Sequence, residues 1–116
     1  MARDQIARVR RLCLALPGVE EGTSYGTTAF RVRKKLLVRM KEDGAALVLK
    51  TATLEDKELF LKMQPEIYYE PDHYKGWPAV LIRLPKISDA QLKSRIEEAW
   101  RREAGKKLMM ALEGSR

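Results

Sequence analysis

Apolar residues recur at helical spacing near the start of the chain, over residues 2–16. They form one stripe, which consists of Ile6, Val9, Leu12, Cys13 and Leu16. The opposite side carries Arg3, Arg8, Arg10 and Arg11. This pattern predicts an amphipathic helix with one apolar side and one basic side. Pro17 and Gly18 predict its end, because proline cannot continue a helix and glycine suits the exit.

Residues 28–50 alternate between apolar and polar positions, which is the pattern of half-buried strands. The apolar face of the first two strands consists of Phe30, Val32, Leu36, Val38 and Met40. Asp43 and Gly44 predict a hairpin turn before a third strand, "ALVLK". We therefore expect a three-stranded antiparallel meander, preceded by a loop over residues 18–27, which are rich in glycine, serine and threonine.

Residues 51–87 combine one helix with two further strands. Thr53, with Asp56 three positions later, resembles a capping box and predicts a helix over residues 54–63. The apolar side of this helix consists of Leu54, Leu59, Phe60 and Met63. The run "EIYYE" predicts a short strand, and "WPAVLIRL" predicts a longer one that Pro78 places near an edge or loop at its start.

The last part of the chain predicts a third helix that begins at Ser88. Its buried side consists of Leu92, Ile96, Ala99 and Trp100, and Ser88 with Gln91 fits a capping box. Gly105 breaks or bends this helix before a last helical segment, residues 106–113. The order of elements predicts an α+β fold, in which helices pack on an antiparallel sheet, as a single domain over residues 1–116.

Composition narrows the class of protein. Cys13 is the only cysteine, so no internal disulfide can form, and its helical position predicts a small core residue rather than a reactive thiol. The first residues lack the continuous apolar run of a signal peptide, and no run approaches the length of a membrane span. We therefore expect a cytoplasmic protein without a membrane partner.

Positive charge is concentrated in one segment. The net charge is +7, and no acidic residue occurs between Glu21 and Glu42. The cations of this segment are Arg31, Arg33, Lys34, Lys35, Arg39 and Lys41. Alternation places Arg31, Arg33, Arg39 and Lys41 on the face opposite the apolar one, with Lys34 and Lys35 at the turn. Such a hairpin can contact a phosphate backbone largely independently of sequence, so nucleic acid is the expected partner.

A solvated strand face is the alternative explanation of this charge, because lysine and arginine at a sheet edge also oppose aggregation. The basic side of the first helix is a possible extension of the nucleic-acid surface. The ribbon offers no exposed aromatic side chain, which argues against base stacking on it.

Signals of catalysis are weak. His73 is the only histidine, and the chain contains no metal-ligand spacing, no nucleophile elbow and no phosphate-binding glycine loop. We therefore expect no cofactor, no metal and no enzymatic activity. His73 either shapes its loop or contacts a ligand. In the second case a small-molecule or protein-binding cleft forms between two loops, lined by Tyr25, His73, Tyr74 and Trp77.

Several stretches together resemble the MmcQ/YjbR family of small bacterial proteins. They are "LCLALPGVEEGTSYG", "TAFRVRKKLLVRM", "HYKGWPAVLIRL" and the late Ala99-Trp100, and they extend over about residues 5–102. The resemblance implies a CyaY-like α+β fold, similar to frataxin-type proteins, and a DNA-binding role through likeness to a double-wing domain. The family often has glycine where this chain has Arg33-Lys34. An iron-donor role is disfavoured, since frataxin-type proteins use an acidic first helix and this one is basic.

Overall fold

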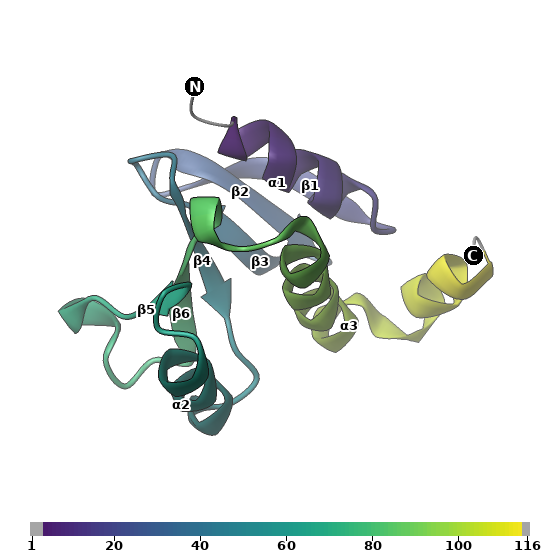
Figure 1. Cartoon of the computed structure of the whole chain (residues 1–116). Helices are drawn as coiled ribbons and strands as arrows, with labels where there is room; N and C mark the ends of the chain where they lie inside the picture. Colours follow the sequence, from purple (N-terminus) through teal and green to yellow (C-terminus); the bar gives the residue numbers. More distant parts are fainter. Residues whose placement is uncertain (1–3, 115–116) are drawn as a thin grey trace.

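Residues 4–114, which a computed structural model of the chain describes, are built around a six-stranded antiparallel sheet (Figure 1). The strands are β1 (Val19–Ser24), β2 (Thr27–Val32), β3 (Lys35–Met40), β4 (Ala46–Lys50), β5 (Tyr68–Tyr69) and β6 (Ala79–Arg83). Their order across the sheet is β1-β2-β3-β4-β6-β5. The first four strands therefore follow one another as hairpins, and β6 lies between β4 and β5.

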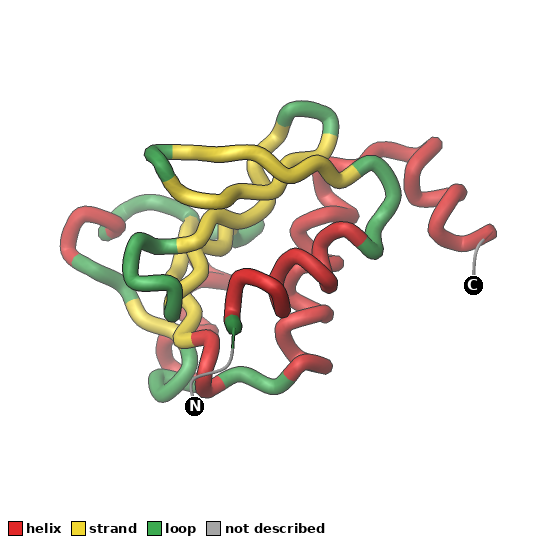
Figure 2. Tube along the Cα trace, turned by 90° about the horizontal axis from the view of Figure 1, so that it is seen from above, coloured by secondary structure: helices red, strands yellow, loops and turns green. Residues whose placement is uncertain are grey.

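The three α-helices of this described part cover one face of the sheet (Figure 2). They are α1 (Gln5–Leu14), α2 (Leu54–Met63) and α3 (Asp89–Gly114), and two short 3-10 helices, η1 (Asp72–Tyr74) and η2 (Leu84–Lys86), lie between α2 and α3. Thr53 accepts a hydrogen bond from the backbone N–H of Asp56, and Ser88 accepts one from Gln91. Both predicted caps are confirmed, as is the α+β architecture.

The core lies between the helices and the sheet. Its largest side chains include Trp100, Tyr68, Phe30, Leu37 and Met40. Trp100 is fully buried and donates its indole N–H to the carbonyl oxygen of Pro17 at 2.9 Å. This bond joins α3 to the turn that follows α1, and it satisfies the polar atom that burial of a tryptophan would otherwise leave unpaired.

Cys13 lies inside this core, as its helical position predicts. Burial, together with the negative charge of Glu21, raises the pKa of the Cys13 thiol to about 12. The thiolate is the reactive form of cysteine. We therefore expect the native protein not to react with the thiol reagent DTNB at neutral pH, and to react rapidly in denaturant. Rapid labelling of the native protein, followed by absorbance, would contradict this placement of Cys13.

The interruption of α3 occurs at Gly105, where the sequence predicts it. The backbone there (φ 82, ψ 166) is not helical. The following segment returns to the domain, because the side chain of Leu108 lies against Gly18 and Leu112 is buried. A Cβ on Gly18 would lie 2.8 Å from Leu108 Cδ1, and the backbone there has φ 74, so both the contact and the backbone favour glycine.

No α-helix of the described residues covers the other face of the sheet, which we call the helix-free face. One row of paired positions crosses it through all six strands, and it consists of Gly22, Ala29, Arg39, Val48, Leu81 and Tyr69. A small buried cluster lies on this face, and Tyr69 and Tyr74 pack against it. Arg39 is the charged member of the row, and it lies near the middle of the sheet.

The loop expected over residues 18–27 is a strand and a hairpin turn instead. β1 pairs with β2 along its whole length, and Tyr25 (φ 53) and Gly26 (φ 78) form the turn between them. The three strands of the expected meander are present as β2, β3 and β4, and β1 precedes them as a fourth strand that was not expected. The strand was missed because β1 is an edge strand of mostly exposed residues, so it lacks the apolar alternation on which the prediction depended.

β3 contains an extra residue that the alternation does not predict. Phe30 pairs with Val38, but the next residue, Arg31, pairs with Leu36. Leu37 is therefore left without a partner in β2, as in a β-bulge, and its side chain is fully buried. The expectation that Leu36 is the core residue here is wrong, since Leu36 is only partly buried.

α2 has the predicted bounds, but it buries a different side. Leu54, Leu59 and Met63 are exposed, whereas Phe60 is partly buried and Lys57 is only 2% exposed. Phe60 stacks on Tyr68, with ring centroids 4.9 Å apart, and this contact fixes which side of α2 faces the sheet. The apolar side inferred from the sequence was therefore wrong at three of its four positions.

Candidate nucleic-acid interface

The tip of the β2–β3 hairpin is a two-residue turn of two cations. Val32 pairs with Lys35, and between them Arg33 (φ 51) and Lys34 (φ 67) both have positive φ. Two-residue hairpin turns of type I′ have this property, and they usually contain asparagine or glycine because other side chains are strained there. The turn carries Arg33, Lys34 and Lys35 as exposed side chains.

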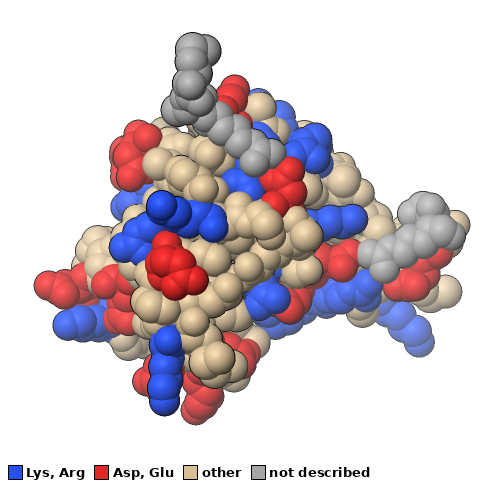
Figure 3. Space-filling view, in the orientation of Figure 1, with Lys and Arg blue, Asp and Glu red and all other residues tan. Residues whose placement is uncertain are grey.

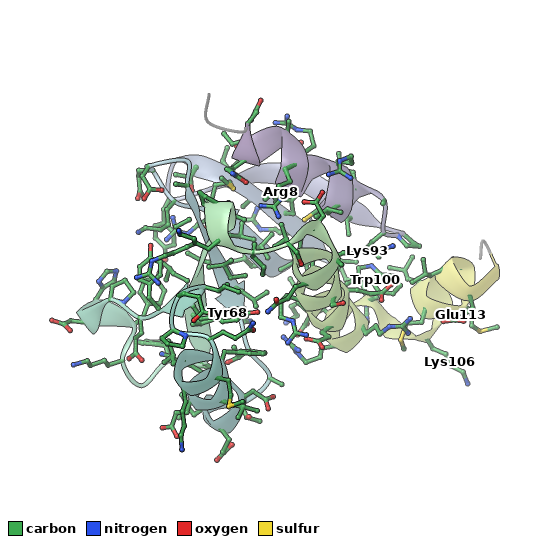
Figure 4. All side chains as sticks on the ribbon, viewed as in Figure 1. Arg8, Tyr68, Lys93, Trp100, Lys106 and Glu113 are labelled. Carbon is green, nitrogen blue, oxygen red and sulfur yellow. The ribbon has the colours of Figure 1, made fainter. Side chains whose placement is uncertain are left out.

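Two more lysines lie beside this tip, from a distant part of the chain. Arg33 lies so close to the break in α3 that a Cβ on Gly105 would be 2.7 Å from its Nη1. A hollow of about 410 Å³ forms there, and its described lining residues are Arg33, Ala104, Gly105, Lys106, Lys107 and Leu108. All the charged members of this set are cations. Figure 3 shows Lys and Arg side chains along the lower border of the C-terminal half of α3, and Figure 4 shows Lys106 pointing away from the domain.

We call this surface the cationic corner, and it consists of Arg33, Lys34, Lys35, Lys106 and Lys107. A second hollow, of about 270 Å³, lies between the ends of β3 and β4 and α3, and Lys50, Arg102 and Glu103 are among its lining residues. Arg102 donates a hydrogen bond to the carbonyl oxygen of Lys50 at 2.9 Å. This bond holds a further arginine and lysine together beside the sheet.

The other predicted cations of the ribbon do not join the tip. Arg31 is partly buried and lies across β1, where its Nη1 would be 3.5 Å from a Cβ on Gly22. The ammonium of Lys41 lies 3.4 Å from the carboxylate of Glu42. A hydrogen bond from its own backbone and the contact with Lys41 lower the pKa of Glu42 below its usual value, so this carboxylate stays charged and opposes the charge of Lys41.

Arg39 is not a solvent-facing residue, and this part of the predicted ribbon is wrong. The side chain lies on the predicted face of the sheet, but the residue is only 7% exposed. Its guanidinium donates to Thr27 Oγ1 at 3.3 Å and to the Tyr74 hydroxyl at 3.0 Å. Alternation predicts the face on which a side chain lies, but it cannot show that a loop from elsewhere covers that face.

Arg39 joins the two loops of the alternative site. Its guanidinium carbon lies 5.2 Å from the centroid of the Tyr25 ring, and the Tyr74 hydroxyl accepts its hydrogen bond from the opposite loop. Glu42 balances the charge, with its carboxylate 3.7 Å from the guanidinium. The β1–β2 turn and the η1 loop therefore both contact Arg39. The alternative site required these two loops to meet, and the sequence alone could not show that they do.

The remaining residues of that site lie on the η1 loop. His73 is exposed, and its ring centroid is 4.6 Å from that of Tyr74 at an angle of 51°. Trp77 is 66% exposed. Lys57 of α2 fixes the loop, because its ammonium donates to the carbonyl oxygens of Tyr74 at 2.7 Å and Trp77 at 2.8 Å.

The basic side of α1 does not extend the cationic corner. Arg8 is 3% exposed, so its predicted place on the polar side is wrong. Arg10 makes two hydrogen bonds to the Glu21 carboxylate, which lower the pKa of Glu21 and raise that of Arg10. Arg11 lies 3.4 Å from Asp89. Arg3 lies outside the described residues.

Within residues 4–114, no three histidine, cysteine, aspartate or glutamate residues are grouped so that they could hold a metal ion. In the same range, no helix is long and apolar enough to cross a membrane.

Three cations of these surfaces were missed at the level of sequence. Lys106 and Lys107 directly follow the predicted break at Gly105, and only the folded chain brings them to Arg33. Lys57 shares a helical stripe with Phe60 and Leu61, which are three and four residues later. Choosing that stripe as the buried side would have placed Lys57 inside.

The model of the YjbR family matches residues 14–102, which is most of the chain. This chain belongs to the YjbR family. Two relatives are the uncharacterized proteins Rv2570 of Mycobacterium tuberculosis and Mb2600 of Mycobacterium bovis. Each is 35% identical over 74 residues, which are 64% of this chain and 49% of the relative. The chain thus spans about half the length of these relatives.

A solved structure supports the YjbR fold. The crystal structure of Deinococcus radiodurans protein DR2400, whose domain is described as DUF419, superposes with a TM-score of 0.69 at 18% sequence identity. The match covers 82% of this chain and 75% of that chain. The likeness at this level of identity shows the shared fold, and the predicted membership of the family is confirmed by the sequence match.

Proposed function

We propose that this YjbR protein binds nucleic acid through the cationic corner and acts by binding rather than by catalysis. The observation that carries the proposal is the hollow in which Arg33 meets Lys106 and Lys107, whose charged lining residues are all positive among those described. Lys34 and Lys35 extend this surface along the hairpin turn. Two segments some seventy residues apart thus contribute cations to one place.

Contacts of this kind recognise the phosphate backbone. Lysine and arginine neutralise phosphates and release condensed counterions, so affinity falls with salt at a log–log slope of about −0.9 per phosphate contacted. Four contacts would give a slope of about −4 on duplex DNA. Phosphates are the same at every base pair, so we expect little dependence on sequence.

The proposal is tested by fluorescence anisotropy of a labelled random duplex at several salt concentrations. A double variant, Lys34→Glu with Lys106→Glu, removes two cations of the corner and adds two negative charges. We expect at least about a tenfold loss of affinity at low salt and a slope that is shallower by about two. Both lysines are exposed, so folding should be retained.

The control is Lys62→Glu with Lys86→Glu, which makes the same change of net charge at exposed positions outside the corner. We expect less than about a threefold loss for this control, since it alters only the distant field of the protein. Equal losses for the two double variants would place binding elsewhere. No binding by the unaltered protein at low salt would overturn the proposal.

A further inference from the structure

We infer that the Tyr25 turn and the η1 loop, which meet Arg39 at the helix-free face, take unpaired bases of single-stranded nucleic acid, which stack on Tyr25 and Trp77. The inference rests on the proposed function and names the form of nucleic acid that the protein prefers. Tyr25 is 88% exposed and Trp77 is 66% exposed, and each lies on a loop that is fixed by a buried cation, Arg39 or Lys57.

Tyr25 occupies a backbone position that does not favour tyrosine. Its φ of 53 lies in the left-handed region, where a bulky side chain is strained and asparagine or glycine is preferred. Burial does not offset this strain, because most of the side chain is exposed. Strained backbone of this kind is concentrated at residues that take part in binding or catalysis.

Arg39 is a positioning residue on this face. Its guanidinium lies at the Tyr25 ring and donates to Thr27 and Tyr74, so its charge and its donors are already used inside the protein. We therefore assign it no phosphate. Its position instead orders the Tyr25 ring, because a cation near an aromatic face is attracted to it, and the exposed remainder of the ring is open to a base.

Trp77 is presented by a backbone that α2 holds in place. The ammonium of Lys57 donates hydrogen bonds to the carbonyl oxygens of both Tyr74 and Trp77, so the chain between them is fixed at both ends. Tyr74 in turn packs against the buried cluster of the helix-free face. A backbone that is already fixed loses little freedom when a base stacks on the exposed indole that it carries, which favours binding.

The Tyr25 turn and the cationic corner lie at opposite ends of β2. β2 begins beside the Tyr25 turn and ends beside Arg33, and its six residues span about 20 Å. Arg31 lies between the two ends on the helix-free face. An extended polyanion along β2 would therefore meet an aromatic ring at one end and the corner at the other.

The exposure of the rings favours a nucleic-acid strand over a small planar molecule. Pockets for small ligands bury most of the ligand between walls, whereas Tyr25 is almost fully open. Proteins that bind single strands combine a positive surface with exposed aromatic rings, and every base has a face that can stack. The net charge of +7 suits the same partner.

The test compares two labelled oligomers of equal length, oligo(dT) and its abasic counterpart, which keeps the phosphates and lacks the bases. The unaltered protein should bind oligo(dT) at least about tenfold more tightly than the abasic oligomer, because stacking strengthens binding at each base. Tyr25→Asn should remove most of this difference and leave abasic binding unchanged. Asparagine suits the turn, so this variant should fold. Met63→Ala, at an exposed position on α2, is the control and should change neither affinity.

Tryptophan fluorescence gives an independent readout. The chain contains two tryptophans, Trp77 and the fully buried Trp100. Oligo(dT) should quench the emission of the unaltered protein, and Trp77→Phe should abolish this response because Trp100 cannot reach a base. The abasic oligomer should leave the emission unchanged in both proteins.

Three outcomes separate this inference from the proposed function. Equal binding of the two oligomers, with losses only in the Lys34→Glu/Lys106→Glu variant, would overturn base stacking and leave the cationic corner. A loss on oligo(dT) in Tyr25→Asn, with no effect of the lysine variant, would support the helix-free face and overturn the corner. Failure of both oligomers and the duplex to bind at low salt would overturn both.

Discussion

We expect replacement of Lys57 by methionine to lower the free energy of unfolding by about 3 kcal/mol. The change leaves one carboxylate and two carbonyl groups without the buried cation that they contact. Lys57 is only 2% exposed. Its ammonium lies 2.7 Å from the carbonyl oxygen of Tyr74, 2.8 Å from that of Trp77 and 3.6 Å from the carboxylate of Glu70. Methionine retains most of the length of the side chain but donates no hydrogen bond.

Guanidinium chloride unfolding, followed by tryptophan fluorescence, measures this loss as a shift of the midpoint at constant slope. Lys62→Met is the matched control, since Lys62 is an exposed lysine of the same helix, and we expect a change within about 0.5 kcal/mol. Adding Glu70→Gln to Lys57→Met should recover part of the loss, because it removes the unpaired carboxylate. A midpoint unchanged by Lys57→Met would show that the ammonium is not buried as described.

The same variant connects stability with the proposed binding surface. Without Lys57 the η1 loop is no longer fixed at Tyr74 and Trp77, so we expect faster hydrogen exchange in residues 74–77 at conditions where the sheet remains protected. Binding of oligo(dT) should weaken together with this exchange, whereas binding through the cationic corner should not. The contrast separates an effect on the loop from general unfolding.

Much of the fold follows from local patterns in the sequence. The α2 bounds, the caps at Thr53 and Ser88, the break at Gly105 and the buried Cys13 agree with the structure. Each of these depends on residues within a few positions of one another, where helix capping, glycine geometry and apolar spacing act directly. The α+β class follows from the order of such local elements.

The two arginines that were wrongly predicted to be exposed are covered by distant parts of the chain. Arg39 lies on the predicted face of β3, yet Tyr74, 35 residues later, closes over it. Arg8 lies on a side of α1 that the sequence marks as basic, yet η2 and the segment after it cover it from 76 to 79 residues away. A polar residue at a position that the sequence pattern assigns to the surface is predicted to be solvated. Only knowledge of the segment that covers it would change this prediction.

The candidate site was likewise predicted only in its local part. The hairpin tip was predicted as a cationic turn, and both of its residues have the positive φ that a two-residue turn requires. The lysines that complete the corner lie beyond Gly105, and no local pattern connects them with Arg33. Arg8 and Arg39 were wrongly predicted to be exposed, and the buried Lys57 was missed. The exposed cations of the hairpin turn were predicted correctly, since turns lie at the surface.

Replacement of Arg8 by methionine should destabilise the protein by at least about 3 kcal/mol, the loss typical of removing one partner from a buried charged network. Arg8 is 3% exposed and lies between α1 and the start of α3 (Figure 4). Its guanidinium donates to Asp89 at 2.6 Å, to the carbonyl oxygen of Leu84 at 2.6 Å and to that of Ile87. These bonds hold η2 and the first turn of α3 against α1.

The neighbouring Arg11→Met variant is the control that separates burial from charge. Arg11 also contacts Asp89, at 3.4 Å, but its side chain is 60% exposed, and exposed ion pairs contribute about 0–1 kcal/mol. Both variants remove one positive charge from α1 beside the same carboxylate. Denaturant midpoints should therefore differ widely between them, because only Arg8→Met removes a buried guanidinium that donates to two carbonyl groups. Similar midpoints would mean that the hydrogen bonds of Arg8 add nothing to the effect of losing one charge. In that case α1, η2 and α3 are held together by apolar packing.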